Sequence, residues 1–454
     1  MGGRDAAMKD RWITPSPDAE EKQTQKFEAW KAGGNVPFES PDAKALYQHR
    51  VTLIKDAVQL EKVPERVPVC PASGHFPIEY AGITWSEAMY DYQKLTWAWE
   101  KYHEDFATDV FNGPRGVVPG KSLDLLDFKL YRWAGNGLRD DQEYQFVERE
   151  YMAAEAYQDL IDDPTGFFLT DYFPKIFHGL APFENFPMLP PVHEIPLVPP
   201  AMMPFGTPEM KKAMQLLGEA GDETHRWNAE VGRTSLQIMG RGLPSFSGGF
   251  SKAPFDVIGD SLRGTRGVLL DMFRHKDELM EACERITPFM VKCGIAACRA
   301  SGHMMPYLPL HKGADGFMSD AQFKTFYWPT LRKVAIGLID AGLVPILFAE
   351  GSYNQRLEVI GDLPKGKAIW LFDKTDMKRA KAAIGHVCCI AGNVPLDLLC
   401  TGTPDDVIQY CRQLIDTAGK NGGFILSTGA GMQGARPGNI KAMIDFSREY
   451  GIYR

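Results

Sequence analysis

From Pro208 to the C-terminus the chain repeats one pattern, in which a short apolar run ends in Gly, Asp, Asn or Ser and an amphipathic helical stretch follows. Five apolar runs carry the pattern: HMMPYLPLHKG, LVPILFAEG, KAIWLFDKT, VCCIAGN and GFILSTGAG. Regular alternation of strand and helix is typical of an α/β protein with a parallel sheet. It gives either an open doubly wound sheet or a closed barrel, and both place their chemistry at the carboxyl ends of the strands.

Polar side chains stand where four of the predicted strands end. His311, Glu350 and Asp373 each close an apolar run, and Asn393 follows the next one. We expect all four at one mouth. A carboxylate directly after a buried strand is costly unless it binds a cation, a proton or a hydrogen-bonding partner, so Glu350 is the most informative. Each residue also has a structural explanation, such as a carboxylate paired with an arginine or a histidine in a surface loop.

Two further residues near these strand ends have open interpretations. Tyr353 lies in the predicted loop after Glu350, where its phenol could bind a substrate or pack in the core. His303 precedes a strand and is either a ligand or a core histidine. The sequence has neither a GxGxxG motif after its first strand nor a GxxxxGK[ST] motif, which removes the best support for nucleotide binding.

The N-terminal part and a proline-rich stretch differ from this pattern. Helical periodicity in EEKQTQKFEAWKAGG and LYQHRVTLIKDAVQL predicts a helical extension over residues 1–62. Residues 63–454 form the α/β part, with an insertion around 165–208. Its proline-rich end, 186–208, is too interrupted for a helix or a central strand and too apolar for a free linker. We predict a packed loop or lid that covers its apolar side chains, namely Met188, Leu189, Met202, Met203 and Phe205.

Composition limits the partners and the compartment. A formal net charge of −8 argues against nucleic acid as the main partner and favours small molecules and proteins. The chain has no apolar run of about 18–20 residues and its N-terminus has no apolar signal core, so we predict a cytoplasmic protein that does not enter the membrane. The eight cysteines form neither a disulfide framework nor a CxxC pair and are expected to be reduced.

Four longer stretches support a family resemblance: FDVIGDSLRGTRGVLLDMFRHKDELMEA at 255–282, FMSDAQFKTFYWPTLRKVAIGLIDAGLVPILFAEG at 317–351, IAGNVPLDLLCTGTPDDVIQYCRQLID at 390–416 and GGFILSTGAGMQGARPGNIKAMID at 422–445. In order and spacing they resemble the uroporphyrinogen decarboxylase superfamily, which includes corrinoid-dependent methyltransferases. The segment RVPVCPASGHFPIEYAGITWSEA at 66–88 looks like the family's opening strand and helix. The resemblance implies a (β/α)₈ TIM-type barrel, here with the N-terminal helical extension and the proline-rich insertion.

Departures from the family pattern narrow the expected activity. True uroporphyrinogen decarboxylases follow the first strand with an arginine-rich stretch, but PASGHFPIEYAG has no arginine, and only Arg263 and Arg266 are well placed to grip carboxylates. Thiol-methylating members hold zinc with His-x-Cys and Gly-Cys-Gly motifs. This chain has Phe348-Ala349-Glu350 and Gly429-Ala430-Gly431 there. A zinc ion would therefore need another ligand set, such as Glu350 with His311, Asp373 or His303.

The resemblance points to an O-demethylase type of methyltransferase component. It would move a methyl group between a methoxylated, optionally aromatic, small molecule and cobalamin, in either direction. The cobalamin would be carried by a partner corrinoid protein or bound at the barrel mouth. A homo-oligomer is one option for the assembly. The expected catalytic residues are Glu350, Asp373, His311 and Tyr353, with Glu350, His311 and Asp373 as metal ligands. The expected substrate-binding residues are His75, Asp260, Arg263, Arg266, Asn393 and His303.

Two alternatives stay open at this stage. One is a metal-independent decarboxylase or lyase acting on a small carboxylic or aromatic substrate through Asp260, Arg263, Arg266 and His75. The other is a non-catalytic binding subunit that kept the barrel and lost the family's zinc ligands.

Overall fold

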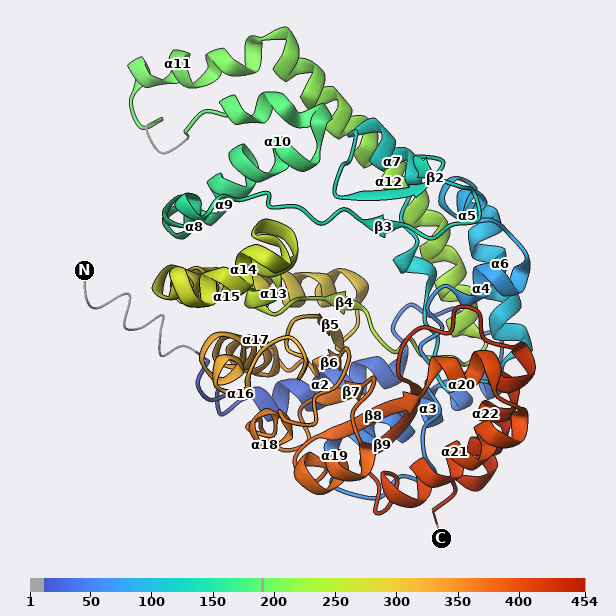
Figure 1. Ribbon diagram of the computed structural model, residues 1–454. Coiled ribbons are helices and arrows are strands. Elements are labelled where there is room, and N and C mark those ends of the chain that lie inside the picture. The colour runs from blue at the N-terminus through green and yellow to red at the C-terminus, as the bar shows by residue number, and fades with distance from the viewer. Residues whose placement is uncertain (1–11, 189–191, 454) are drawn as a thin grey trace.

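The computed structural model describes residues 12–188 and 192–453. At its centre is a six-stranded, all-parallel sheet with its strands in sequence order, β4-β5-β6-β7-β8-β9 (Figure 1). The strands are β4 (Gly249–Phe250), β5 (Pro306–Leu310), β6 (Ile346–Ala349), β7 (Ile369–Phe372), β8 (Cys389–Val394) and β9 (Phe424–Thr428). The five runs predicted from sequence are β5 to β9, and the prediction of an α/β protein with a parallel sheet is confirmed.

The central strands are apolar because both faces of the sheet are covered. Every residue of β7, β8 and β9 is buried. Continuous apolar runs, rather than alternating ones, are typical of parallel sheets with helices packed on them. The register aligns Leu310 with Ala349 and Ala349 with Phe372, so β5, β6 and β7 end side by side.

Helices connect consecutive strands, as predicted, and one more follows the last strand. They are α14 (Gly264–Arg274), α15 (Lys276–Ser301), α16 (Asp320–Gln322), α17 (Trp328–Asp340), α18 (Leu357–Ile360), α19 (Met377–Ile384), α20 (Leu396–Thr401), α21 (Pro404–Thr417) and α22 (Pro437–Tyr450). Ser319 and Thr403 each form a capping box. Asp376 caps α19, because its side chain accepts from the backbone N–H of Arg379.

Single backbone hydrogen bonds extend from both edges of the sheet. The N–H of Cys70 donates to Leu426 O at 2.8 Å, and the N–H of Asp109 donates to Val69 O at 3.0 Å. The N–H of Phe111 then donates to Pro244 O at 2.8 Å, just before β4. The segments around 68–70 and 109–111 therefore lie between β9 and β4, and the first of them belongs to the opening strand expected within 66–88.

The N-terminal extension packs into the main core. Its helices are α2 (Ala19–Ala32) and α3 (Pro41–Gln59), as periodicity predicted. Phe27, Trp30 and Ile54 belong to the same hydrophobic cluster as the strands β6 to β9. The extension is thus continuous with the α/β core.

Most of the elements between residues 76 and 262 are short, although one helix has 33 residues. They are α4 (Phe76–Ala81), α5 (Trp85–Tyr90), α6 (Tyr92–Asp105), η1 (Pro114–Gly116), α7 (Gly120–Leu125), β1 (Tyr131–Ala134), β2 (Gly137–Leu138), β3 (Gln145–Phe146), η2 (Ala154–Ala156), α8 (Tyr157–Asp162), α9 (Pro164–Phe167), η3 (Phe168–Tyr172), α10 (Phe173–Ile176), η4 (His178–Asn185), α12 (Pro208–Gly240), α13 (Pro254–Asp256) and the π-helical turn η7 (Val257–Leu262). A π-helical turn, η8 (Phe323–Tyr327), precedes α17. No helix in the described part of the chain is long and apolar enough to cross a membrane.

The proline-rich stretch corrects the sequence prediction. It contains the short helices η5 (Ile195–Leu197), α11 (Val198–Met202) and η6 (Met203–Gly206) rather than a loop. Each carries a proline in its first turn, where the missing N–H has no helical partner to lose. α10 and α11 lie at the end of the molecule opposite α19 and α21 (Figure 1).

The prediction that the apolar side chains of this stretch are covered is also wrong for most of them. Met188 is 80%, Met203 70% and Met202 46% exposed. Phe205 is half-buried against Phe186, whose ring centroid is 5.1 Å away. Leu189 lies outside the described residues. The short helices are held through a small separate core that includes η4 and α12.

Candidate active site

The carboxyl ends of β5, β6 and β7 bring together three residues predicted from sequence. His311, Glu350 and Asp373 directly follow these strands, which end in register. The side chain of His311 is 38% exposed and that of Glu350 54%, so both are accessible at the mouth. The three residues therefore follow neighbouring strand ends at one edge of the sheet.

His311 and Asp260 form the central pair of the site. The Nδ1–H of His311 donates to Oδ2 of Asp260 at 2.7 Å, and Nε2 lies 3.6 Å from Oε2 of Glu350. Burial lowers the pKa of His311, but the hydrogen bond and the negative charge of Asp260 outweigh burial, so the pKa lies above its ordinary value. The pair therefore favours a protonated imidazole whose Nε2–H is directed to the mouth.

Asp260 is held as an anion by two ammonium groups. Lys252 Nζ lies 2.5 Å and Lys312 Nζ 2.9 Å from its carboxylate, which is 12% exposed. Burial raises the pKa of Asp260, but the hydrogen bond from His311 and the two lysines lower it below the ordinary range. Sequence reasoning placed Asp260 in the site but missed both lysines.

Asp256 is a further residue that sequence reasoning missed. It is fully buried and accepts hydrogen bonds from the backbone N–H groups of His311 and Lys312, each at 3.0 Å, and from the Tyr327 hydroxyl at 2.7 Å. Burial and the charge of Asp260 raise the pKa of Asp256. Asp256 fixes the backbone that carries His311. Its signal in the sequence is the spacing of four residues to Asp260, which puts both carboxylates on one helical face.

Tyr353 lies beneath the mouth. It is fully buried, its backbone N–H donates to Thr375 Oγ1 at 2.9 Å, and its hydroxyl donates to Leu310 O at 3.3 Å. Burial raises the pKa of the Tyr353 phenol well above its usual range. These contacts join the loops after β5, β6 and β7, so Tyr353 fits a structural role better than the predicted catalytic one.

Asp373 and Asn393 also shape these loops. Oδ2 of Asp373 accepts from the Gly351 N–H at 3.0 Å, and burial raises the pKa of Asp373. Asn393, which is 4% exposed, donates from Nδ2 to the carbonyls of Asp373 at 2.9 Å and Thr375 at 2.8 Å. Asn393 therefore contacts backbone rather than the open mouth.

The residues present do not form a zinc site. A catalytic zinc is usually held by three protein ligands. Within the described residues, 12–188 and 192–453, no group of three His, Cys, Asp or Glu side chains is suited to hold a metal ion. His311 and Glu350 are close, but Asp373 is hydrogen-bonded to Gly351. The proposed set of Glu350, His311 and Asp373 therefore does not fit.

Three residues predicted to bind substrate are placed differently by the structure. Arg263 is 5% exposed, and its guanidinium contacts Asp271 at 2.6 Å, Glu150 and the Met152 carbonyl. Arg266 is exposed and has no ion pair in the described structure. His303 precedes β5, at the opposite end from the mouth. Both of its nitrogens bind backbone groups, at Ser245 O (2.8 Å) and Met305 N (3.1 Å), and burial lowers its pKa to about 4.

His75 lies at the same end of the sheet as His311, after the segment that pairs with β9. Its Nδ1 is 2.7 Å from Oε1 of Glu143 and 3.3 Å from Nε2 of Gln433. The rings of Trp85 and Tyr144 meet it edge-on, with centroids 4.7 Å and 5.6 Å away. Glu143, Gln433 and the two aromatic residues were not predicted, because they come from segments far apart in sequence.

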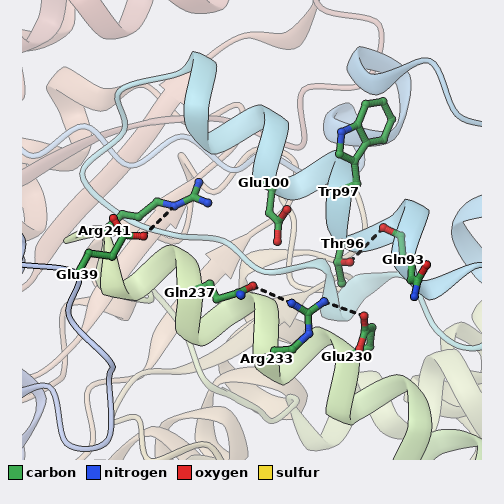
Figure 2. Close-up of a pocket in the computed structure, with 9 residues that line it drawn as sticks. All are labelled: Glu39, Gln93, Thr96, Trp97, Glu100, Glu230, Arg233, Gln237 and Arg241. Carbon is green, nitrogen blue, oxygen red and sulfur yellow. Dashed lines mark hydrogen bonds and ion pairs between the residues drawn. The ribbon is translucent and has the colours of Figure 1, made fainter.

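A groove of about 370 Å³ lies away from these residues, between α6 and α12 (Figure 2). Two ion pairs line it: Arg233 contacts Glu230 at 2.7 Å, and Arg241 contacts Glu39 at 3.5 Å. None of the site residues predicted from sequence lines it. We interpret it as a solvated surface groove.

Comparisons with known proteins agree with the fold. A family model described as uroporphyrinogen decarboxylase (URO-D) matches residues 242–450. Among solved structures, a methyltransferase from Methanosarcina mazei has a TM-score of 0.56 and 16% sequence identity, over 89% of this chain and 98% of that chain. No curated protein matches the sequence. The resemblance inferred from the four C-terminal stretches is confirmed, and the structural likeness extends it to the fold of most of the chain.

Proposed function

We propose, on the premise that residues 242–450 form a domain of the uroporphyrinogen decarboxylase family, that this chain is a methyltransferase acting on an oxygen-bound methyl group. The methyl group would pass between a methoxylated small molecule and cobalamin. The fold shared with a methyltransferase supports methyl transfer as the reaction class. The chemistry of the mouth supports oxygen as the leaving atom.

We also infer that the sheet closes as an eight-stranded barrel. The backbone hydrogen bonds from β9 through 68–70 and 109–111 to the segment before β4 support this inference. Closure would place the loops after all eight strands around one mouth, where barrel enzymes carry their active sites. The loop with His75 and the loop with His311 would then belong to the same site.

One observation carries the proposed chemistry: a histidine with a raised pKa, held by a buried carboxylate, presents Nε2–H at the mouth. When a methyl–oxygen bond breaks, the electron pair stays on oxygen, and the resulting alkoxide or phenolate must be stabilised. His311 would supply its Nε2 proton to that oxygen. General acids of this kind contribute about 10²–10⁴-fold to a rate.

The neighbours of His311 support this role. Asp260 fixes the imidazole through Nδ1 and stabilises its positive charge, and Lys252 and Lys312 keep Asp260 ionised. Glu350, 3.6 Å from Nε2, would orient the proton donor or the substrate. Because the residues do not fit a three-ligand zinc site, no step of the proposal uses zinc.

Cobalamin, when bound or presented by a corrinoid protein, supplies the cobalt that accepts or donates the methyl group. The side chains of His311 and Glu350 are exposed at the mouth, so a second molecule that carries cobalamin could reach them. A corrinoid protein is therefore the proposed partner.

The test combines the chain with cob(I)alamin and a panel of methyl ethers and follows the methylcobalamin absorption spectrum. We expect methyl transfer that His311→Gln reduces strongly. His49→Gln, at an exposed histidine that pairs with Glu65 at 2.8 Å, is the matched control. No transfer in either direction with any ether would refute the proposal. Release of CO₂ from carboxylic substrates would instead favour a decarboxylase, although Arg263 is already occupied by Asp271 and Glu150.

A further inference from the structure

A second histidine–carboxylate pair lies at the same end of the sheet as His311. Glu143 accepts from Nδ1 of His75 at 2.7 Å, as Asp260 accepts from Nδ1 of His311. The side chain of His75 is 11% exposed and that of Glu143 40%. Within the described part of the chain, Nε2 of His75 has no hydrogen-bonding partner. Gly116 lies against this nitrogen, where an added Cβ would be 3.2 Å away, and the proposed chemistry at His311 does not use it.

Aromatic rings surround this second pair. Trp85 and Tyr144 contact the His75 ring edge-on, and Tyr144 in turn contacts Tyr131, with centroids 5.6 Å apart. Trp85 is buried, whereas His75, Tyr144 and Tyr131 are half-buried and keep part of their surface accessible. We call His75, Trp85, Tyr131 and Tyr144 the aromatic wall.

The aromatic wall extends towards the His311 pair. Tyr131 in β1 pairs with Phe146 in β3, and burial followed by the charge of Asp260 raises the pKa of the Tyr131 phenol. The segment that follows Tyr144 is attached near the His311 pair, because Glu148 accepts from the Thr265 N–H at 2.6 Å. Lys312 binds the hydroxyl of that threonine at 3.0 Å. The wall and the His311 pair are thus two parts of one neighbourhood.

We propose that the aromatic wall binds the ring of an aromatic substrate and that Nε2 of His75 hydrogen-bonds an oxygen substituent on that ring. The inference rests on the proposed function, because it assigns the substrate class of the same mouth. Protein aromatic rings prefer edge-on or offset contact with another ring, which a saturated ring of the same size cannot reproduce. Glu143 accepts from Nδ1 of His75, so Nε2 accepts from a hydroxyl when the ring is neutral and donates to a carboxylate when the ring is protonated.

The experiment measures binding to the full chain without cobalamin, by titration calorimetry with phenol, benzoate and cyclohexanol. We expect phenol or benzoate to bind at least about tenfold more tightly than cyclohexanol, because only the aromatic ligands satisfy the wall. Tyr144→Leu and His75→Gln should each weaken aromatic binding by about tenfold, or 1.4 kcal/mol. His49→Gln, the matched control in an exposed histidine–glutamate pair, should bind like the wild type.

The outcomes separate this inference from the proposed function. Equal binding of phenol and cyclohexanol, or unchanged binding in both wall variants, would overturn it. If Tyr144→Leu does not fold, Glu143→Gln at a 40% exposed side chain tests the same pair, and unchanged binding there would overturn it too. Aromatic binding without methyl transfer would support the wall and refute the function. Methyl transfer from aliphatic ethers without aromatic preference would do the reverse.

Discussion

The two sides of the mouth are built in different ways. On the side of β5 to β8, side chains are fixed by bonds to backbone: Asp256 binds two N–H groups, Asp373 binds one, and Asn393 binds two carbonyls. On the opposite side, the aromatic wall is held by ring contacts and by one hydrogen bond between His75 and Glu143.

This difference separates the proposed chemistry from the proposed recognition. A proton donor must be held within a fraction of an ångström of its target, and bonds from buried carboxylates to backbone provide this precision. A recognition surface needs shape and polarity more than a fixed position, and inserted segments change more readily than a strand end does. The comparison therefore predicts large effects on the first side and small effects on the second.

The largest expected effect is that of His311→Gln on the rate of methyl transfer. Loss of a general acid should lower kcat by about 10²-fold or more, with a smaller loss for a methyl ether whose leaving phenol carries a nitro group. Such a phenolate needs less stabilisation by a proton. Single-turnover rates with both ethers provide the measurement, and an equal loss for both would argue against proton donation to the leaving oxygen.

The pH dependence of the methyl-transfer rate should reflect the His311–Asp260 pair. Because Asp260 raises the pKa of His311, the protonated form extends to higher pH, and the rate should fall as pH rises through that raised value. Asp260→Asn should move this descending limb to lower pH. The stability from this pair is complete below the unfolded-state pKa of His, about 6.5, and is lost as pH rises through the folded-state pKa. If the descending limb of the pH–rate profile does not move in Asp260→Asn, the limb does not report the titration of His311.

Sequence alone identified the strand-end residues on one side of the mouth, although it missed Asp256, Lys252 and Lys312. The ends of β5, β6 and β7 could be predicted because parallel strands buried on both faces are continuous apolar runs, and the first polar residue marks where each run ends. His311, Glu350 and Asp373 were identified by this rule, and Asp260 by the family resemblance. Sequence could not show that Asn393 and Tyr353 bond to backbone groups, since a polar residue at a strand end looks the same whether it faces the mouth or the adjoining loop.

The other side could not be predicted, because its contacts join distant segments. His75, Glu143 and Gln433 lie in three different regions of the chain, and no periodicity links them. The proline-rich stretch was misjudged because proline was treated as a helix breaker, although it starts short helices readily. Arg263 was assigned to substrate because its partner Asp271, eight residues further along in α14, could not be recognised from spacing.

A smaller effect is expected for Asp256→Asn, measured as the free energy of unfolding in urea. The amide of an asparagine would place its NH₂ group opposite an N–H or O–H donor that now hydrogen-bonds to the carboxylate of Asp256. A buried polar group left without a partner costs about 1–3 kcal/mol. Tyr327→Phe, which removes one of the three donors, should cost about 0.5–1.5 kcal/mol. A loss below that of Tyr327→Phe would mean that Asp256 does not hold the strand end.

The smallest effect is expected for Glu143→Gln on the opposite side. Its carboxylate is 40% exposed, and exposed ion pairs contribute about 0–1 kcal/mol. Urea unfolding of Glu143→Gln should therefore resemble that of Glu65→Gln, which weakens the exposed pair with His49. A loss above about 2 kcal/mol would mean that the His75–Glu143 pair supports the fold as strongly as a buried contact does. The contrast between a fixed catalytic side and an adaptable recognition side would then fail.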